Sequence, residues 1–247
     1  MLDNSTSSSC LFTRKEMYLL SCKESGKLRY WASQPERVRR KSCYNNMHLA
    51  YDMTFTSENG FAVMQPYTGC TDFVSVHYND RFKADGKGQM LQFFTDDYRF
   101  RDTVWFDLER FTYRISHFDL YATPDFSMWK NSPTEYYNIE AVFKTRFVGA
   151  YWQQCGYDVI PTASWGGVNS FAYCFEGLPK YSVIGVSGTG NNKNAEAYAL
   201  WCYGLKRLET EKEPILIIIY GEEVEVPGLH TPLKFIPDFI STKLRKL

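Results

Sequence analysis

Two short apolar runs of the sequence end in carboxylates, at Asp96–Asp97 and at Asp125, with Ser127 close behind. Two carboxylates at neighbouring strand ends could share a divalent cation through oxygen ligands, as Mg²⁺ prefers, or divide into an acid and a base according to their surroundings. The structural alternative makes Asp97 or Asp102 the cap of the following helix and Asp125 the head of a turn. We therefore take Asp97 and Asp125 as the candidate catalytic pair. They are also candidate metal ligands if a cation is used; the cofactor is otherwise unknown.

A glycine-rich stretch, SGTGNN at residues 187–192, separates an apolar run from a helical pattern. Backbone N–H groups just before a helix form a favourable site for a phosphate group. The stretch lacks the Gly-Lys-Ser/Thr order of the nucleoside-triphosphate loop, and such a stretch is also often only a turn. Trp165, followed by two glycines, is a candidate for stacking on a base or a sugar, or for plugging the end of the sheet.

The elements that would position these residues are strands that alternate with helices. Apolar runs at residues 91–94, 118–122, 157–161, 182–186, 215–219 and 233–236 predict strands, with earlier candidates at 61–64, after an Asn59-Gly60 hairpin turn, and at 73–77. Alternation with helices indicates βαβ crossovers and a mainly parallel sheet in an α/β fold. The number of repeated units, and the absence of a dinucleotide fingerprint, favour a TIM-barrel-like or incomplete barrel. The alternative is an open doubly wound sheet.

Three helices carry clear signals. Ser132 is a candidate N-cap with Pro133 at the first helical position and Glu135 behind it, and Gly156 would end that helix. A second helix is predicted over residues 194–208. A third helix is predicted from apolar residues at spacings of four, three and four, which would form its buried face: Val104, Leu108, Phe111 and Ile115.

In parallel sheets and barrels, ligands bind beyond the carboxyl ends of the strands. We expect Thr162, Ser164 and Glu222 on that edge, together with Asp97 and Asp125. We predict that the substrate is bound there by the following residues: Asp96, Ser127, Trp165, Ser187, Thr189, Asn191 and Tyr220.

The 247 residues carry 28 basic and 28 acidic side chains, which excludes binding of nucleic acid by overall charge alone. A local basic face is still open. Residues 23–41 are basic and contain Tyr30 and Trp31, a composition typical either of a single-stranded nucleic-acid contact or of a solvated helix face. We predict a partly disordered, basic N-terminal extension over residues 1–50 and a single α/β domain over residues 51–247.

No apolar run reaches the roughly 18–20 residues that span a bilayer, and the N-terminus lacks the pattern of a secretory signal. The seven cysteines are scattered without metal or redox spacing, and the four histidines stand far apart. Reduced thiols, no membrane contact and a cytoplasmic location are therefore expected.

Several short motifs occur in register: FTDDYRF at residues 94–100, PDFS at 124–127, GAYWQ at 149–153, VIP at 159–161 with SWG at 164–166, and YG at 220–221. Together they resemble an uncharacterised domain-of-unknown-function family of bacteriophages, prophages and bacterial mobile elements. The resemblance covers roughly residues 60–221. It implies origin and domain extent, and a host-cell cytoplasmic location if the chain is phage-encoded, but it implies no activity.

Three functions are consistent with these features. The first is an enzyme acting on a phosphate-bearing substrate, a nucleotide or nucleic acid, at the carboxyl ends of the strands. The second is a non-catalytic protein of a mobile element that holds nucleic acid or a host protein through residues 23–41 and the basic residues 243–246. The third is a protein that sequesters a small molecule at the same edge without turnover.

Overall fold

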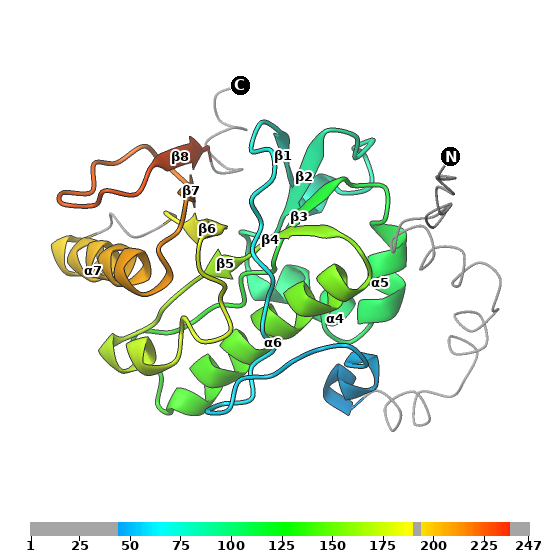
Figure 1. The fold of residues 1–247 in the computed structure, drawn as a ribbon, viewed down its shortest axis with the longest axis horizontal. Coiled ribbons are helices and arrows are strands. Elements are labelled where there is room, and N and C mark those ends of the chain that lie inside the picture. Colours follow the sequence, from blue (N-terminus) through cyan, green and yellow to red (C-terminus); the bar gives the residue numbers. More distant parts are fainter. Residues whose placement is uncertain (1–43, 190–193, 238–247) are drawn as a thin grey trace, which may run out of the picture.

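The computed structural model describes residues 44–189 and 194–237 (Figure 1). Several sequence predictions fall outside these residues. They concern the basic segment 23–41, the basic residues 243–246 and the end of the glycine-rich stretch, which includes Asn191.

The described residues contain eight strands, and within each sheet every pair of neighbouring strands is parallel. The first four form one sheet: β1 (Val74–His77), β2 (Gln89–Gln92), β3 (Leu120–Ala122) and β4 (Asp158–Ile160). The second sheet contains β5 (Thr162–Ala163), β6 (Val183–Ser187), β7 (Leu216–Tyr220) and β8 (Leu233–Ile236). The predicted α/β fold with a mainly parallel sheet is therefore confirmed.

Only Pro161 separates β4 from β5, and at this residue the chain changes partner from β3 to β6. Pro161 has no N–H to donate, but its carbonyl accepts a hydrogen bond from the backbone N–H of Gly185 at 2.8 Å. On the other side, the N–H of Thr162 donates to the hydroxyl oxygen of Thr123 at 2.8 Å. The two sheets are thus joined by one nearly continuous stretch of backbone.

The strand order follows the chain order without reversal, so the structure lacks the switch point of a doubly wound sheet. It is not a closed barrel either, because among the described strands β1 pairs only with β2 and β8 only with β7. The side chain of Lys234 reaches across the gap: its ammonium, in β8, donates to the carbonyl of Thr71, shortly before β1. The prediction of a TIM-barrel-like fold is not confirmed.

The helices are α4 (Arg101–Val104), α5 (Leu108–Arg114), α6 (Glu135–Gln154) and α7 (Ala195–Lys212). Short 3-10 helices lie at Tyr44–Leu49, Tyr78–Asp80, Asp97–Arg99 and Val168–Ala172. Helices α4, α5 and α6 accompany the first sheet, whereas α7 lies beside the second (Figure 1). Asn194 caps α7 by accepting a hydrogen bond from the N–H of Ala197 at 2.8 Å. Gly156, with φ +86°, follows the end of α6 as predicted.

Four local predictions are corrected. The strand predicted at residues 91–94 is β2, which lies two residues earlier, and the helix predicted from Val104 to Ile115 is divided into α4 and α5 by a turn at residues 105–107. Helix α6 is capped by Thr134 rather than Ser132, because Thr134 has the extended backbone and its hydroxyl accepts from the N–H of Tyr136. The chain does reverse at Gly60, where φ is +67°, but residues 61–64 form only an isolated bridge, Phe55 with Ala62. The N–H of Met64 instead donates to the carbonyl of Gly177, which ends the pairing with the hairpin partner.

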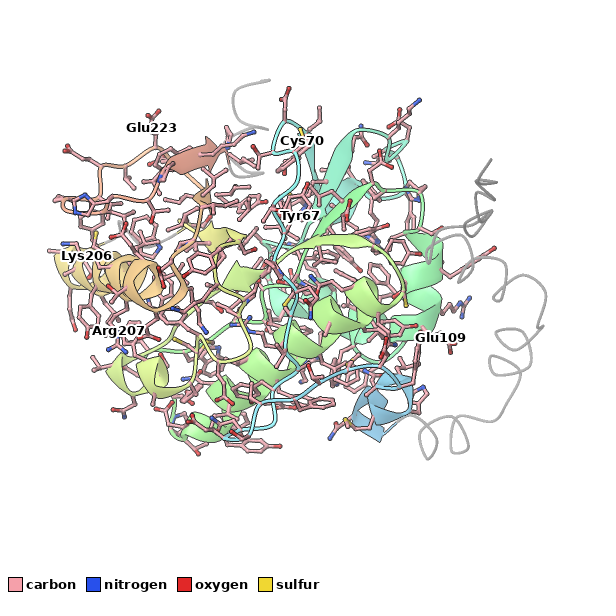
Figure 2. The ribbon with its side chains drawn as sticks, in the orientation of Figure 1. Tyr67, Cys70, Glu109, Lys206, Arg207 and Glu223 are labelled. Atoms are coloured by element: carbon pink, nitrogen blue, oxygen red, sulfur yellow. The ribbon has the colours of Figure 1, made fainter. Side chains whose placement is uncertain are left out.

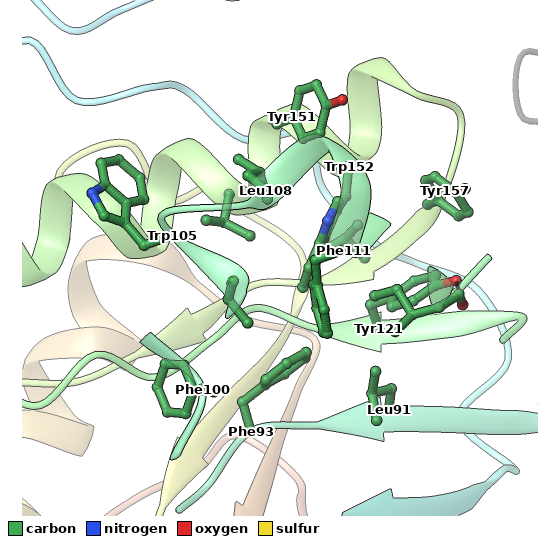
Figure 3. Close-up of a cluster of buried hydrophobic side chains, with 14 of the residues drawn as sticks. Leu91, Phe93, Phe100, Trp105, Leu108, Phe111, Tyr121, Tyr151, Trp152 and Tyr157 are labelled. Carbon is green, nitrogen blue, oxygen red and sulfur yellow. Dashed lines mark hydrogen bonds between the residues drawn. The ribbon is translucent and has the colours of Figure 1, made fainter. Parts of the chain in front are cut away.

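Apolar side chains bury both faces of the first sheet. Leu91 and Tyr121 point into a cluster with α4, α5 and α6, part of which is shown in Figure 3. The neighbouring Met90 and Leu120 point into a second cluster on the opposite face, shared with β6 and β7. A third cluster packs β6 and β7 against α7. Burial on both faces explains why the strands read as continuous apolar runs.

Arg146, in the middle of α6, is the most buried charged side chain described, with an exposed fraction of 1%. Its Nη1 donates to the carbonyl of Thr162 in β5 at 2.9 Å. Its Nη2 and Nε donate to the carbonyls of Cys174 and Glu176 at 2.7 and 3.0 Å. One guanidinium therefore fastens the helix of the first sheet to the first strand of the second and to the loop that follows.

We expect Arg146→Met to lower the free energy of unfolding by about 3 kcal/mol or more, because three buried carbonyls lose their donors. Urea denaturation monitored by circular dichroism measures this change. The matched control is Arg101→Met, whose guanidinium is half exposed and pairs with the exposed Asp102; it should change stability by less than about 0.5 kcal/mol. Equal losses in the two variants would contradict the structural role of Arg146.

Candidate functional site

A pocket of about 240 Å³ lies at the carboxyl ends of β3, β5 and β6. We call it the rim pocket. Six residues that the sequence analysis placed on this edge line it: Asp125, Ser127, Ser164, Trp165, Ser187 and Thr189. The remaining lining residues are Met128, Ala163, Val186 and Trp201. The parallel register therefore gathers hydroxyl groups, one carboxyl group and two indoles at one place.

Among the residues that the structure describes, Asp125 is the only ionisable side chain that lines the rim pocket. Its Oδ1 is buried and has no hydrogen-bond partner among the described residues. Burial raises the pKa of Asp125 to about 7, a hydrogen bond from the side chain of Ser164 acts against this rise, and the charge of Asp97 adds to it. The charge of Arg146 also favours the ionised form. The result is a carboxyl group that titrates near neutral pH.

Asp97 has a different environment, although it is close enough for its charge to act on Asp125. Its two carboxylate oxygens accept hydrogen bonds from the backbone N–H of Ser127 at 3.1 and 3.2 Å, and its Oδ1 also accepts from the Ser127 hydroxyl at 2.8 Å. Burial raises the pKa of Asp97, and the bonds from Ser127 oppose that rise. Asp97 does not line the rim pocket; it fixes the loop that carries Asp125 and Ser127.

The described part of the chain provides few ligands for a metal ion. No group of three or more His, Cys, Asp or Glu side chains comes together there. A pair of carboxylates could still bind Mg²⁺ with the help of substrate oxygens. Because Asp97 is already engaged by Ser127, Asp125 would have to supply the carboxylate from inside the pocket, so we derive no step through a metal.

The far wall of the pocket is set by β6 and α7. The indole N–H of Trp201 donates to the carbonyl of Ser187 at 2.9 Å. The ring of Trp165 packs beside Phe171 and against Gly204 of α7. A Cβ on Gly204 would lie 2.1 Å from that ring, so only glycine allows the contact. Trp165 is thus both a pocket wall and part of the core.

Other residues of the predicted edge lie away from the pocket. Asp96 is exposed and pairs with Arg99. Tyr220 is buried in the opposite cluster, where its ring stacks on Phe94 with centroids 4.1 Å apart and its hydroxyl contacts the sulfur of Met90. Two further residues are Thr162, which bonds to the Thr123 hydroxyl, and the exposed Glu222.

Sequence reasoning did not connect Met128, Trp201 or Arg146 with the site. Trp201 lies in the helix predicted over residues 194–208, where an apolar side chain is expected to pack in the core. Arg146 interrupts the apolar stripe of another predicted helix, and that interruption was the available signal. Lys206 and Arg207 lie along α7 (Figure 2), and neither lines the pocket. Among the described residues, the lining therefore contains no cation.

The fold and site define an α/β protein with parallel sheets and a polar pocket at their carboxyl edge. The chain belongs to the family described as Domain of unknown function (DUF4417), whose model matches residues 65–233. This confirms the resemblance drawn from the motifs.

Two phage proteins are similar to the chain. The Gene 1 protein of Mycobacterium phage L5 is 34% identical over 201 residues, which cover 78% of this chain and 82% of the phage protein. The Gene 1 protein of Mycobacterium phage D29 is 33% identical over 196 residues, covering 78% and 69%. No solved structure matches the chain. None of the helices in the described residues is long and apolar enough to cross a membrane.

We expect the neutral substitution Asp125→Asn to change how stability depends on pH. In the folded protein Asp125 keeps its proton up to about pH 7, whereas in the unfolded chain it ionises near pH 4. The folded state therefore binds more protons in this window, and the wild type should lose stability relative to the variant as pH rises from 4 to 7. The upper limit of this loss is roughly 4 kcal/mol.

Urea denaturation at pH 4.5, 6 and 8 measures the difference. Asp102→Asn serves as the control, because that carboxylate is exposed and pairs with Arg101; its curve should run parallel to the wild type. Parallel curves for Asp125→Asn as well would show that Asp125 is not held protonated.

Proposed function

We propose that the protein is an enzyme that holds a nucleotide-type, phosphate-bearing substrate at the rim pocket and uses Asp125 as general acid or base. The observation that carries the proposal is the buried Oδ1 of Asp125, which has no partner in the described structure and borders an open pocket. A buried polar atom without a partner costs about 1–3 kcal/mol, so its retention calls for an explanation. A substrate hydrogen bond supplies one.

The titration of Asp125 suits this role. A general acid or base works best when its pKa lies near the operating pH, because both protonation states are then populated. Burial raises the pKa of Asp125 to about 7, which lies in this range. Ser164 holds one side of the carboxyl group, and Arg146 keeps the ionised form accessible. Asp97 supports the geometry from behind by holding Ser127.

The pocket's size and charge restrict which part of the substrate enters. About 240 Å³ is below the roughly 300–1,000 Å³ of pockets for drug-sized ligands, so the pocket fits one ring rather than a whole nucleotide. Its hydroxyl groups and indoles suit an uncharged base or sugar, and its carboxyl group would repel a phosphate. We therefore place the ring inside and the phosphate outside, towards the backbone of Ser187 and Thr189.

A non-catalytic binding protein is the second candidate. It is favoured by the finding that a single ionisable group of the described residues lines the pocket, whereas acid–base enzymes commonly use two groups in different roles. Such a protein would bind the same ring and form no product. A nucleic-acid contact through residues 23–41 stays a prediction, because those residues lie outside the described structure.

A panel of the common nucleosides and nucleoside monophosphates tests the proposal, with binding followed by thermal unfolding and turnover by chromatography. We expect at least one nucleotide to raise the melting temperature and to be converted to product. Asp125→Asn should keep most of the binding, because its amide retains the shape of the carboxyl group, but should lower kcat by about 100-fold or more.

The matched control is Asp102→Asn, which changes an exposed carboxylate outside the pocket and should behave as the wild type. Stabilisation without any product would favour the binding protein. An Asp125→Asn variant with wild-type turnover would rule out Asp125 as the acid or base.

A further inference from the structure

A second cluster of functional groups lies on the loop between β1 and β2 and at the end of α5, two segments that adjoin in Figure 1. The ring of Phe82 is about half exposed. The guanidinium carbon of Arg81 lies 4.4 Å from its centroid, and that of Arg114 lies 4.6 Å from it. The two guanidinium carbons are therefore no more than about 9 Å apart.

Arg81 is held in place before any ligand arrives. Its guanidinium carbon lies 3.8 Å from the centroid of the buried Tyr78 ring, and its Nη1 donates to the Tyr78 carbonyl at 2.8 Å. The Nε2 of His117 contacts the carbonyl oxygen of Arg81 at 3.2 Å. A side chain fixed in this way loses little conformational freedom on binding.

Neither arginine has a carboxylate partner in the described residues. Asp80, the nearest acid in the sequence, pairs with Lys83 at 2.8 Å, and Asp107 is 3.9 Å from Arg110. The Nε of Arg81 is also buried without an acceptor among these residues. Burial lowers the pKa of Arg81, Tyr78 opposes this effect, and the charge of Arg114 lowers it further. Two close cations without a counter-ion repel each other, and an anion removes that repulsion.

Structural contacts account for each arginine separately, since Tyr78 holds Arg81 and the end of α5 favours Arg114. Arg114 is the last residue of α5, where a cation is stabilised by the helix dipole. That effect gives no reason for a second guanidinium to lie over the same phenylalanine ring. Cation–π contacts with one half-exposed ring contribute about 0.5–1 kcal/mol each and leave most guanidinium N–H groups free for a ligand.

We propose that Arg81, Phe82 and Arg114 form a binding site for a phosphate group. Two planar guanidinium groups can donate to more oxygens than one carboxylate carries, so a phosphate group is the better ligand for the pair. The exposed Phe82 ring offers a stacking surface beside them. None of the three residues lines the rim pocket, so the site goes beyond the proposed function and does not depend on it. The phosphate can belong to a nucleic-acid strand or to a small phosphate compound.

Binding of two probes by the full chain tests the site. Inorganic pyrophosphate, followed by calorimetry, represents the small compound, and a fluorescent oligothymidine, followed by anisotropy between 50 and 200 mM salt, represents the strand. The variants are Arg114→Gln, which changes an exposed side chain and should leave the fold intact, and Phe82→Ala. Arg101→Gln is the control, because its guanidinium is similarly exposed but paired with Asp102.

If a strand is the ligand, we expect Arg114→Gln to weaken oligothymidine binding and to reduce the slope of log K against log salt by about 1, with a weaker affinity also in Phe82→Ala. If a small compound is the ligand, pyrophosphate should bind to the wild type and to Arg101→Gln but at least tenfold more weakly to Arg114→Gln. Either result supports the phosphate site. Absence of binding of both probes to the wild type, or equal binding by Arg114→Gln and Arg101→Gln, would overturn it.

Discussion

The buried guanidinium of Arg146 is the interaction on which the rest of the structure depends. Arg146 belongs to α6, which packs on the first sheet, and its guanidinium donates to the carbonyl of Thr162 in the second sheet. Desolvating this charge is costly, and the three carbonyls that accept its hydrogen bonds offset the cost. An apolar residue could fill the same volume, but it could not specify which carbonyls lie together. The guanidinium therefore fixes how β5 and the segment around Cys174 sit against α6.

The same group connects the fold with the rim pocket. Thr162 stands next to Pro161, where the chain leaves the first sheet for the second, and its hydroxyl bonds to Thr123 at the end of β3. Asp125 follows Thr123 by two residues, and Ser164 follows Thr162 by two. The join between the sheets thus brings Asp125 and Ser164 to one pocket, and the positive charge of Arg146 lies close enough to act on the Asp125 carboxyl.

Local patterns predicted the strands well because both faces of the sheet are buried. The last strand, Leu233–Ile236, matches the prediction to the residue, and β7 differs from it by one residue at each end. Features that depend on distant residues could not be predicted. The N-cap of α6 is Thr134 and not the predicted Ser132, because the capping residue is determined by its backbone geometry. Closure into a barrel depends on whether β8 pairs with β1, and the local sequence of either strand does not determine that pairing.

The same limit applies to the site. The βα pattern was sufficient to gather six of the pocket residues, since parallel strands place their carboxyl ends at one edge. It could not separate the roles of Asp97 and Asp125, because the partner that distinguishes them, Ser127, lies 30 residues from Asp97. The half-buried Asp97 accepts hydrogen bonds from Ser127, whereas the Oδ1 of Asp125 accepts none from the described residues. Asp97 and Asp125 therefore have different roles although both follow adjacent strands. Asp97 stabilises a loop, whereas Asp125 has an oxygen without a hydrogen-bond partner among the described residues. Since an unmet bond lowers stability, Asp125 is the carboxylate whose position a ligand, rather than the fold, best explains.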